Sequence, residues 1–81
     1  MSVEDKALAM KVRREVVRRS LDASRLYIHS TNGNVELGGT VAPARKGTTL
    51  DLEAELEIIK ERVMRMPGVR DLRWTYLNFA R

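Results

Sequence analysis

The sequence has no cysteine among its 81 residues, which excludes disulfide bonds, thiolate metal sites and nucleophilic cysteine chemistry. Its single histidine, His29, makes a poor metal site without a second histidine or a cysteine, so we interpret it as a partly exposed strand residue. Aromatic residues make up only 5% of the chain, and the longest uncharged stretches are too short to span a bilayer. We therefore expect no enzymatic activity, no bound metal and no cofactor.

Hydrophobic residues at 43% and charged residues at 32% are typical of a globular domain, and the length allows one domain over residues 1–81 with a core at about 5–77. The net charge of +4 favours anionic partners only weakly. All of the excess lies in the first 48 residues, which hold nine bases and five acids. Because the N-terminus lacks a secretory signal, we expect a cytoplasmic location, or a periplasmic or envelope one if the chain was trimmed from a longer protein.

An apolar stripe at helical spacing predicts a first helix from about Val3 to Arg19, with Ser2 as its N-cap. The stripe consists of Leu8, Val12 and Val16. A second, weaker apolar line runs along the opposite side of this helix through Val3, Met10, Val17 and Leu21. We expect this second line to pack on strands or on another copy of the chain.

The segment from Leu26 to Ser30 alternates apolar and polar residues and predicts a strand. Asn-Gly at 32–33 predicts a tight hairpin turn, because both central positions of a type I′ turn need positive φ, and the alternation resumes after it. Gly38 and Gly39 then indicate a bulge or a close approach of the backbone, before the strand breaks at Pro43.

A second amphipathic helix is predicted to begin at Thr49 or Asp51, to reach Met66 and to stop at Pro67 and Gly68. Its apolar stripe consists of Leu52, Leu56, Ile59, Val63 and Met66. The segment from Leu72 to Leu77 predicts a last strand. The order α-β-β-α-β predicts an α+β two-layer sandwich with two helices on one face of a three-stranded mixed sheet.

Three segments carry a family pattern, namely Asp5 to Val12, Asn32 to Val41 and Met66 to Leu72. Together they resemble the BON domain of bacterial osmotically inducible and nodulation proteins, over roughly Asp5 to Leu77. The residues themselves have structural explanations, with Gly33 and Gly39 in tight backbone turns and Pro67 and Gly68 at a helix stop. The resemblance implies a non-catalytic binding module that attaches to a phospholipid surface or to another envelope component.

The candidate binding residues are Lys11, Arg14 and Arg18, which fall within an arc of about 60° on the first helix. Arginine suits such a surface because its planar guanidinium binds phosphate with two hydrogen bonds. The structural alternative is that these bases form only a solvated face. Lys6 and Arg13 form a separate line that suits a protein interface.

Two other functions compete with membrane attachment. A protein-interaction or self-associating domain is one, because small α+β sandwiches recur in ring-forming secretion components and one edge strand is expected to be open. An RNA-binding domain of KH-like topology is the other, but the Gly-x-x-Gly loop that would clamp nucleic acid is missing. Trp74, Tyr76 and Phe79 are expected to serve the core rather than a base-stacking platform.

Overall fold

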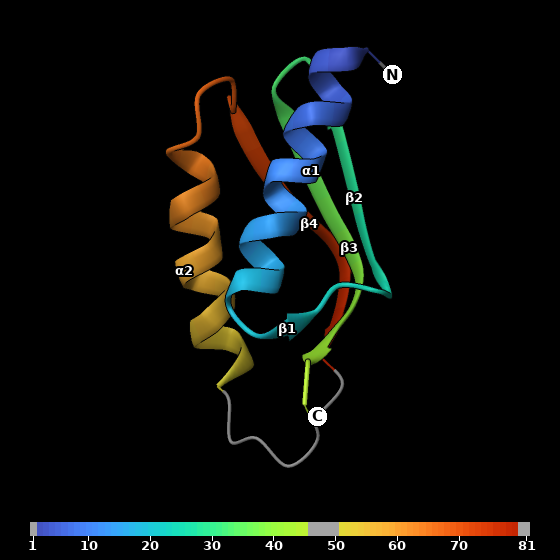
Figure 1. The fold of residues 1–81 in the computed structure, drawn as a ribbon, viewed down its shortest axis with the longest axis vertical. Coiled ribbons are helices and arrows are strands. Elements are labelled where there is room, and N and C mark those ends of the chain that lie inside the picture. Colours follow the sequence, from blue (N-terminus) through green and yellow to red (C-terminus); the bar gives the residue numbers. More distant parts are fainter. Residues whose placement is uncertain (1, 46–50, 80–81) are drawn as a thin grey trace.

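The computed structural model describes residues 2–45 and 51–79, apart from the side chains of 75–77. It confirms the α+β class and the two-layer arrangement, with both helices on one face of the sheet (Figure 1). The elements in chain order are α1 (Val3–Arg18), β1 (Leu21–Asp22), β2 (Leu26–Thr31), β3 (Asn34–Pro43), α2 (Leu52–Met64) and β4 (Asp71–Phe79).

The ten-residue strand β3 lies at the centre of the mixed sheet. β2 and the short β1 both pair with β3 in antiparallel fashion, and β4 pairs with β3 in parallel. The parallel pair is joined by α2, because a parallel connection must cross from one end of the sheet to the other. This crossover lays α2 beside α1 on the same face of the sheet (Figure 1).

The predicted order is wrong in one respect, because the sheet of the described residues has four strands rather than three. The sequence of residues 20–24 is typical of a turn with capping residues. In the structure, however, Leu21 pairs with Pro43 and Asp22 pairs with Ala42 to form β1. Leu21 is only 2% exposed, so it leaves the outer apolar line on which the sequence placed it and joins the core. A two-residue strand is too short to carry any alternation of its own.

The helix ends follow the predicted capping chemistry. The Ser2 hydroxyl accepts a hydrogen bond from the Asp5 amide at 3.1 Å, and the Asp5 carboxylate accepts one from the Ser2 amide, which completes a capping box. Asp51 caps α2 by accepting a hydrogen bond from the Ala54 amide at 3.2 Å, whereas Thr49 lies outside the described residues. α2 ends at Met64, two residues before the predicted Met66.

The glycines of the hairpin adopt the predicted positive φ. Asn32 and Gly33 have φ of 51° and 85°, which confirms the Asn-Gly turn. Gly39 has φ of 93° beside a register shift between β3 and β4, and a Cβ at this position would lie 2.4 Å from the Arg25 carbonyl oxygen. Gly39 therefore serves both the expected bulge and the expected close backbone approach.

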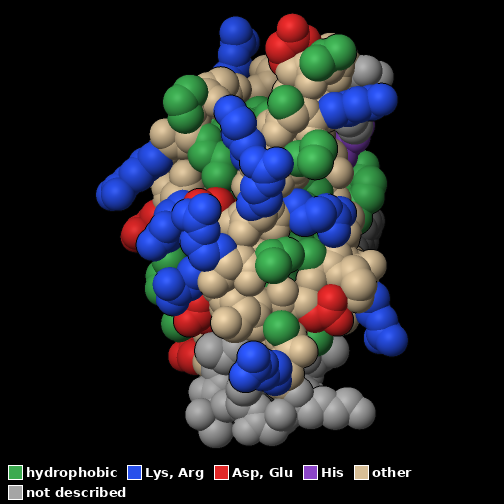
Figure 2. Space-filling view, viewed as in Figure 1, with side chains coloured by type: hydrophobic (Ala, Val, Ile, Leu, Met, Phe, Trp, Pro, Cys, Tyr) green, Lys and Arg blue, Asp and Glu red, His purple; other side chains and the backbone are tan. Residues whose placement is uncertain are grey.

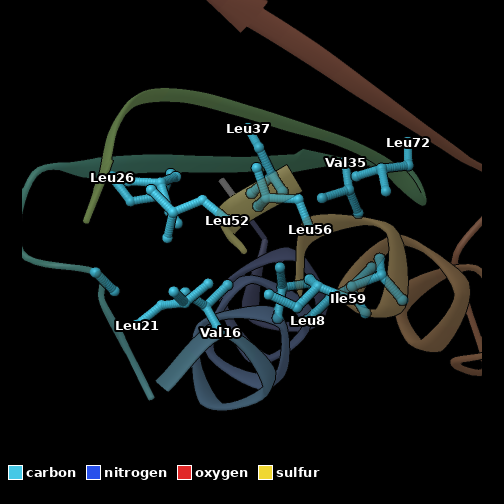
Figure 3. Packing of buried hydrophobic residues seen from close by; sticks show 14 residues of the cluster. Leu8, Val16, Leu21, Leu26, Val35, Leu37, Leu52, Leu56, Ile59 and Leu72 are labelled. Atoms are coloured by element: carbon cyan, nitrogen blue, oxygen red, sulfur yellow. The ribbon is translucent and has the colours of Figure 1, made fainter. Parts of the chain in front are cut away.

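The core fills the space between the helices and the sheet, as Figure 3 shows for its labelled residues. Its fully buried members come from α1, β1, β3 and α2, and include Val12, Val16, Leu37, Leu52 and Ile59. Met66 and Trp74 are partly buried and pack against this cluster. The predicted inner stripes of both helices are thus confirmed, except that Met66 lies beyond the end of α2.

Candidate functional site on the outer face of the first helix

All three candidate cations are exposed on α1, but they line different hollows of the surface. Arg14 and Arg18 border a shallow hollow of about 390 Å³ whose other walls are Met10, Arg13 and Val17. Lys11 instead borders a groove of about 950 Å³ between the first half of α1, the hairpin turn and the loop that follows α2. The structure therefore brings Arg14 and Arg18 together and turns Lys11 towards another part of the surface.

The groove beside Lys11 joins segments that are far apart in the sequence. Gly33, Pro67, Gly68 and Arg70 line it together with Leu8 of α1. The Gly33 carbonyl accepts a hydrogen bond from the Arg70 amide at 2.7 Å, which fixes the hairpin turn to the α2–β4 loop. A Cβ on Gly33 would lie 2.4 Å from the Gly68 carbonyl oxygen, so this motif residue has a packing role.

The outermost part of α1 is an apolar ridge of Val3, Met10 and Val17. These side chains are 79%, 58% and 56% exposed, so they do not pack on the strands as the sequence allowed. Their seven-residue spacing places them on one line along the helix, and Lys6 and Arg14 lie next to that line. Figure 2 shows basic side chains over the helical layer with hydrophobic side chains between them.

The three acids of α1 lie about 100° or more around the helix from this ridge. Glu15 turns towards α2, where its carboxylate lies 3.3 Å from Arg18 and 3.8 Å from Arg62. Asp5 accepts hydrogen bonds from the amides of Ser2 and Asn32. Although its partial burial acts in the opposite direction, these bonds hold the pKa of the Asp5 carboxyl below its usual value. The ridge is therefore bordered by positive charge without competing acids of its own helix.

Arg13 lines the hollow that Arg14 and Arg18 border, but its side chain makes hydrogen bonds within the chain. Its guanidinium donates hydrogen bonds to the Ala23 carbonyl at 2.9 Å and to the Leu26 carbonyl at 3.4 Å. These bonds tie α1 to the bend between β1 and β2. The sequence gives no signal of this contact, because it depends on where the strands lie relative to the helix.

The remaining candidates of the sequence lie away from the ridge. His29 is half-buried on β2, where its Nε2 lies 2.8 Å from the Thr31 hydroxyl and its ring stacks on Tyr27. Trp74 packs partly against the core as expected, whereas the expectation for Phe79 is wrong, because this side chain is 40% exposed; the side chain of Tyr76 lies outside the described part. Within residues 2–45 and 51–79, no cluster of three metal-binding side chains is found, and no helix is long and apolar enough to cross a membrane.

No family model, curated protein or solved structure matches this chain. The resemblance to the BON domain therefore stays a prediction from the sequence. On the described surface, the apolar ridge of α1 with its flanking bases is the feature that packing within the chain does not explain.

Proposed function

We propose that the protein is a non-catalytic binding module that docks on an anionic phospholipid surface through the outer face of α1. The observation that carries this proposal is the exposed ridge of Val3, Met10 and Val17, bordered by Lys6, Arg14 and Arg18. A helix that lies in the membrane interface combines these two features, because its apolar side enters the acyl boundary while its bases meet the phosphates.

The dimensions of α1 suit such a contact. Sixteen helical residues span about 24 Å, and the ridge occupies most of that length on the side that faces away from the sheet. Each base near an anionic bilayer contributes about 1 kcal/mol, and this contribution is screened by salt. With three apolar residues and few bases, the predicted attachment is weak, reversible and strongly dependent on ionic strength.

Lys11 keeps a place in this proposal, although it borders the groove instead of the ridge. It is exposed and lies on the side of α1 next to Arg18 in the helical projection. In the groove Lys11 and Arg70 are balanced by two acids, Glu4 and Asp5. We expect Lys11 to contribute less to attachment than Arg14, which lies beside the ridge.

The test is sedimentation with vesicles that contain phosphatidylglycerol, compared with vesicles of phosphatidylcholine alone, at about 50 and 150 mM salt. The protein is expected to sediment with the anionic vesicles only, and more at the lower salt concentration. Replacement of Lys11, Arg14 and Arg18 by glutamine is expected to abolish this binding while the circular dichroism spectrum stays that of the folded protein.

A matched control removes the same charge from another part of the surface. Lys60→Gln, Arg65→Gln and Arg73→Gln together change three exposed bases outside α1. This variant is expected to keep a large part of the binding, because it leaves the ridge and its flanking bases intact. Equal losses in the two triple variants would contradict the assignment to α1, and displacement from the vesicles by added RNA would favour the nucleic-acid alternative.

A further inference from the structure

The two helices carry opposite charge. α1 contains five bases and three acids, whereas α2 contains two bases and four acids. They meet along one side, where Arg19 donates two hydrogen bonds to Glu55, at 2.6 and 3.1 Å, and Arg62 lies near Glu15. The charges on this inner boundary are therefore paired within the chain.

The opposite charges on the outer sides cannot meet within one molecule. On α1, Met10 lies about 140° around the helix from Glu15, which faces α2. On α2, Glu57 lies about 160° around from Glu55, which faces α1. The basic ridge and the acidic side of α2 thus lie on opposite flanks of the helical layer.

The acidic flank also has an apolar hollow. Glu53, Leu56 and Glu57 of α2 line it together with Trp74 and Phe79 of β4, and its volume is about 190 Å³. Phe79 is 40% exposed, and Met64 is 43% exposed near the end of the same helix. This hollow combines an apolar floor with an acidic rim, whereas the α1 flank combines apolar side chains with bases.

The spacing of the charges matches as well. Arg14 and Arg18 are one helical turn apart at about 6 Å, and so are Glu57 and Glu61. Two exposed bases border these glutamates, because Lys60 lies about 60° around the helix from Glu57 and Arg65 follows Glu61 by one turn. Two arginine–carboxylate pairs and an apolar side chain of the ridge can therefore meet this flank at the same time.

We infer that the α1 flank of one copy docks on the α2–β4 flank of a second copy. Arg14 pairs with Glu57 of the partner, Arg18 exchanges its contact with Glu15 for one with Glu61 of the partner, and Met10 or Val17 enters the hollow at Trp74 and Phe79. Because the two surfaces differ, this contact is heterologous, and it leaves one unoccupied flank at each end of a dimer. Further copies can add until the assembly closes into a ring or continues as a filament. The inference stands independently of lipid attachment, although both use the α1 ridge and therefore compete for it.

The test uses two charge reversals and their mixture. Arg14→Glu/Arg18→Glu makes both flanks acidic, and Glu57→Arg/Glu61→Arg makes both flanks basic. Sedimentation velocity at about 50 mM salt is expected to show a mass that rises with concentration for the unmodified protein, and association at least roughly tenfold weaker for each variant alone. An equimolar mixture of the variants is expected to associate again, because each basic flank then finds an acidic one.

A control reversal, Arg25→Glu/Arg70→Glu, changes the charge equally at two exposed positions that belong to none of α1, α2 and β4, and it is expected to leave association unchanged. A monomer at all concentrations, or variants whose mixture fails to associate, would overturn the inference. The Glu57→Arg/Glu61→Arg variant also separates this inference from the proposed function. It keeps the α1 ridge, so it is expected to bind anionic vesicles at least as well as the unmodified protein while it fails to associate with itself.

Discussion

α1 and α2 are alike on the side that faces the sheet and opposite on the side that faces outwards. Each helix buries an aliphatic stripe, with Val12 and Val16 fully covered on α1 and Leu52 and Ile59 fully covered on α2. On the outer sides, α1 exposes an apolar ridge with bases, whereas α2 exposes mainly acids, together with Lys60 and Met64. The fold needs only the inner stripes, so packing does not account for the outer difference, and the proposed contacts with a membrane or a second copy would account for it.

The boundary between the helices supports this comparison. The Arg19–Glu55 contact pairs two charges across it, and its hydrogen bonds raise the pKa of the Arg19 guanidinium. Glu15 lies between Arg18 and Arg62 in the same region. Charges between the helices thus hold the layer together, whereas Arg14 and Glu57 lie on the outer flanks.

The inner stripes are expected to give the largest effects of substitution. Ile59→Ala in α2 should lower the free energy of unfolding by about 2–5 kcal/mol, and Val16→Ala in α1 by about 1.5–3 kcal/mol, because each leaves a cavity in the core. Val17→Ala, one position further along α1, should change it by less than about 0.5 kcal/mol, since this side chain is mostly exposed. Urea unfolding measures all three, and similar losses for Val16 and Val17 would break the distinction between the two sides.

The ridge is expected to matter for binding and not for stability. Met10→Ser/Val17→Ser should weaken attachment to anionic vesicles by about tenfold, which is about 1.4 kcal/mol, with little change in the urea midpoint. Met64→Ser on α2 is the control, because Met64 is comparably exposed but belongs to the acidic helix. Vesicle titration of the three proteins compares the flanks directly, and an equal loss in the control would show that α1 has no special role.

The N-caps are expected to give a smaller effect of similar size in both helices. Ser2→Ala removes the hydroxyl that accepts from the Asp5 amide, and Asp51→Ala removes the carboxylate that accepts from the Ala54 amide. Each should lower the free energy of unfolding by about 1 kcal/mol. Thermal unfolding measures both changes. A Ser2→Ala protein with the melting temperature of the unmodified protein would show that the capping box contributes nothing to the stability of α1.

Substitution of Asp5 is expected to give the smallest loss of stability, and the size of that loss should depend on pH. Because hydrogen bonds to its carboxylate lower the pKa of Asp5 in the folded state, its contribution is present above the unfolded value of 3.8 and is lost as the pH falls through the lower folded value. Asp5→Asn should therefore lower the melting temperature at pH 7 and approach the unmodified protein in strong acid. An equal difference in melting temperature between the two proteins at pH 7 and in strong acid would contradict a stabilising role of the charged Asp5 carboxylate.

Most of the fold was predictable because its signals are local. The spacing of the inner stripes indicates both helices, and Asn32-Gly33 indicates the hairpin without any knowledge of the rest of the chain. β1 was not predictable, because Leu21 and Asp22 become a strand only through pairing with residues about twenty positions later. Helix α2 ends early for a similar reason, since the chain must turn back through Pro67 to reach β4.

The candidate site was predictable only in part. The helical projection correctly exposes Arg14 and Arg18 on one side of α1, but it cannot show that the α2–β4 loop forms a separate groove with Lys11. It also cannot show that Arg13 bonds two carbonyls at the bend between β1 and β2. Both facts depend on how distant segments approach the helix, which a local pattern does not encode.

Membrane contact of α1 can be tested by site-specific labelling, because the chain contains no cysteine. Met10→Cys on α1 and Met64→Cys on α2 each allow one environment-sensitive fluorophore to be attached at an exposed position. With anionic vesicles at low salt, we expect a blue shift of the emission at position 10 and none at position 64. A shift at position 64 alone, or at neither position, would contradict the claim that α1 carries the membrane-binding face.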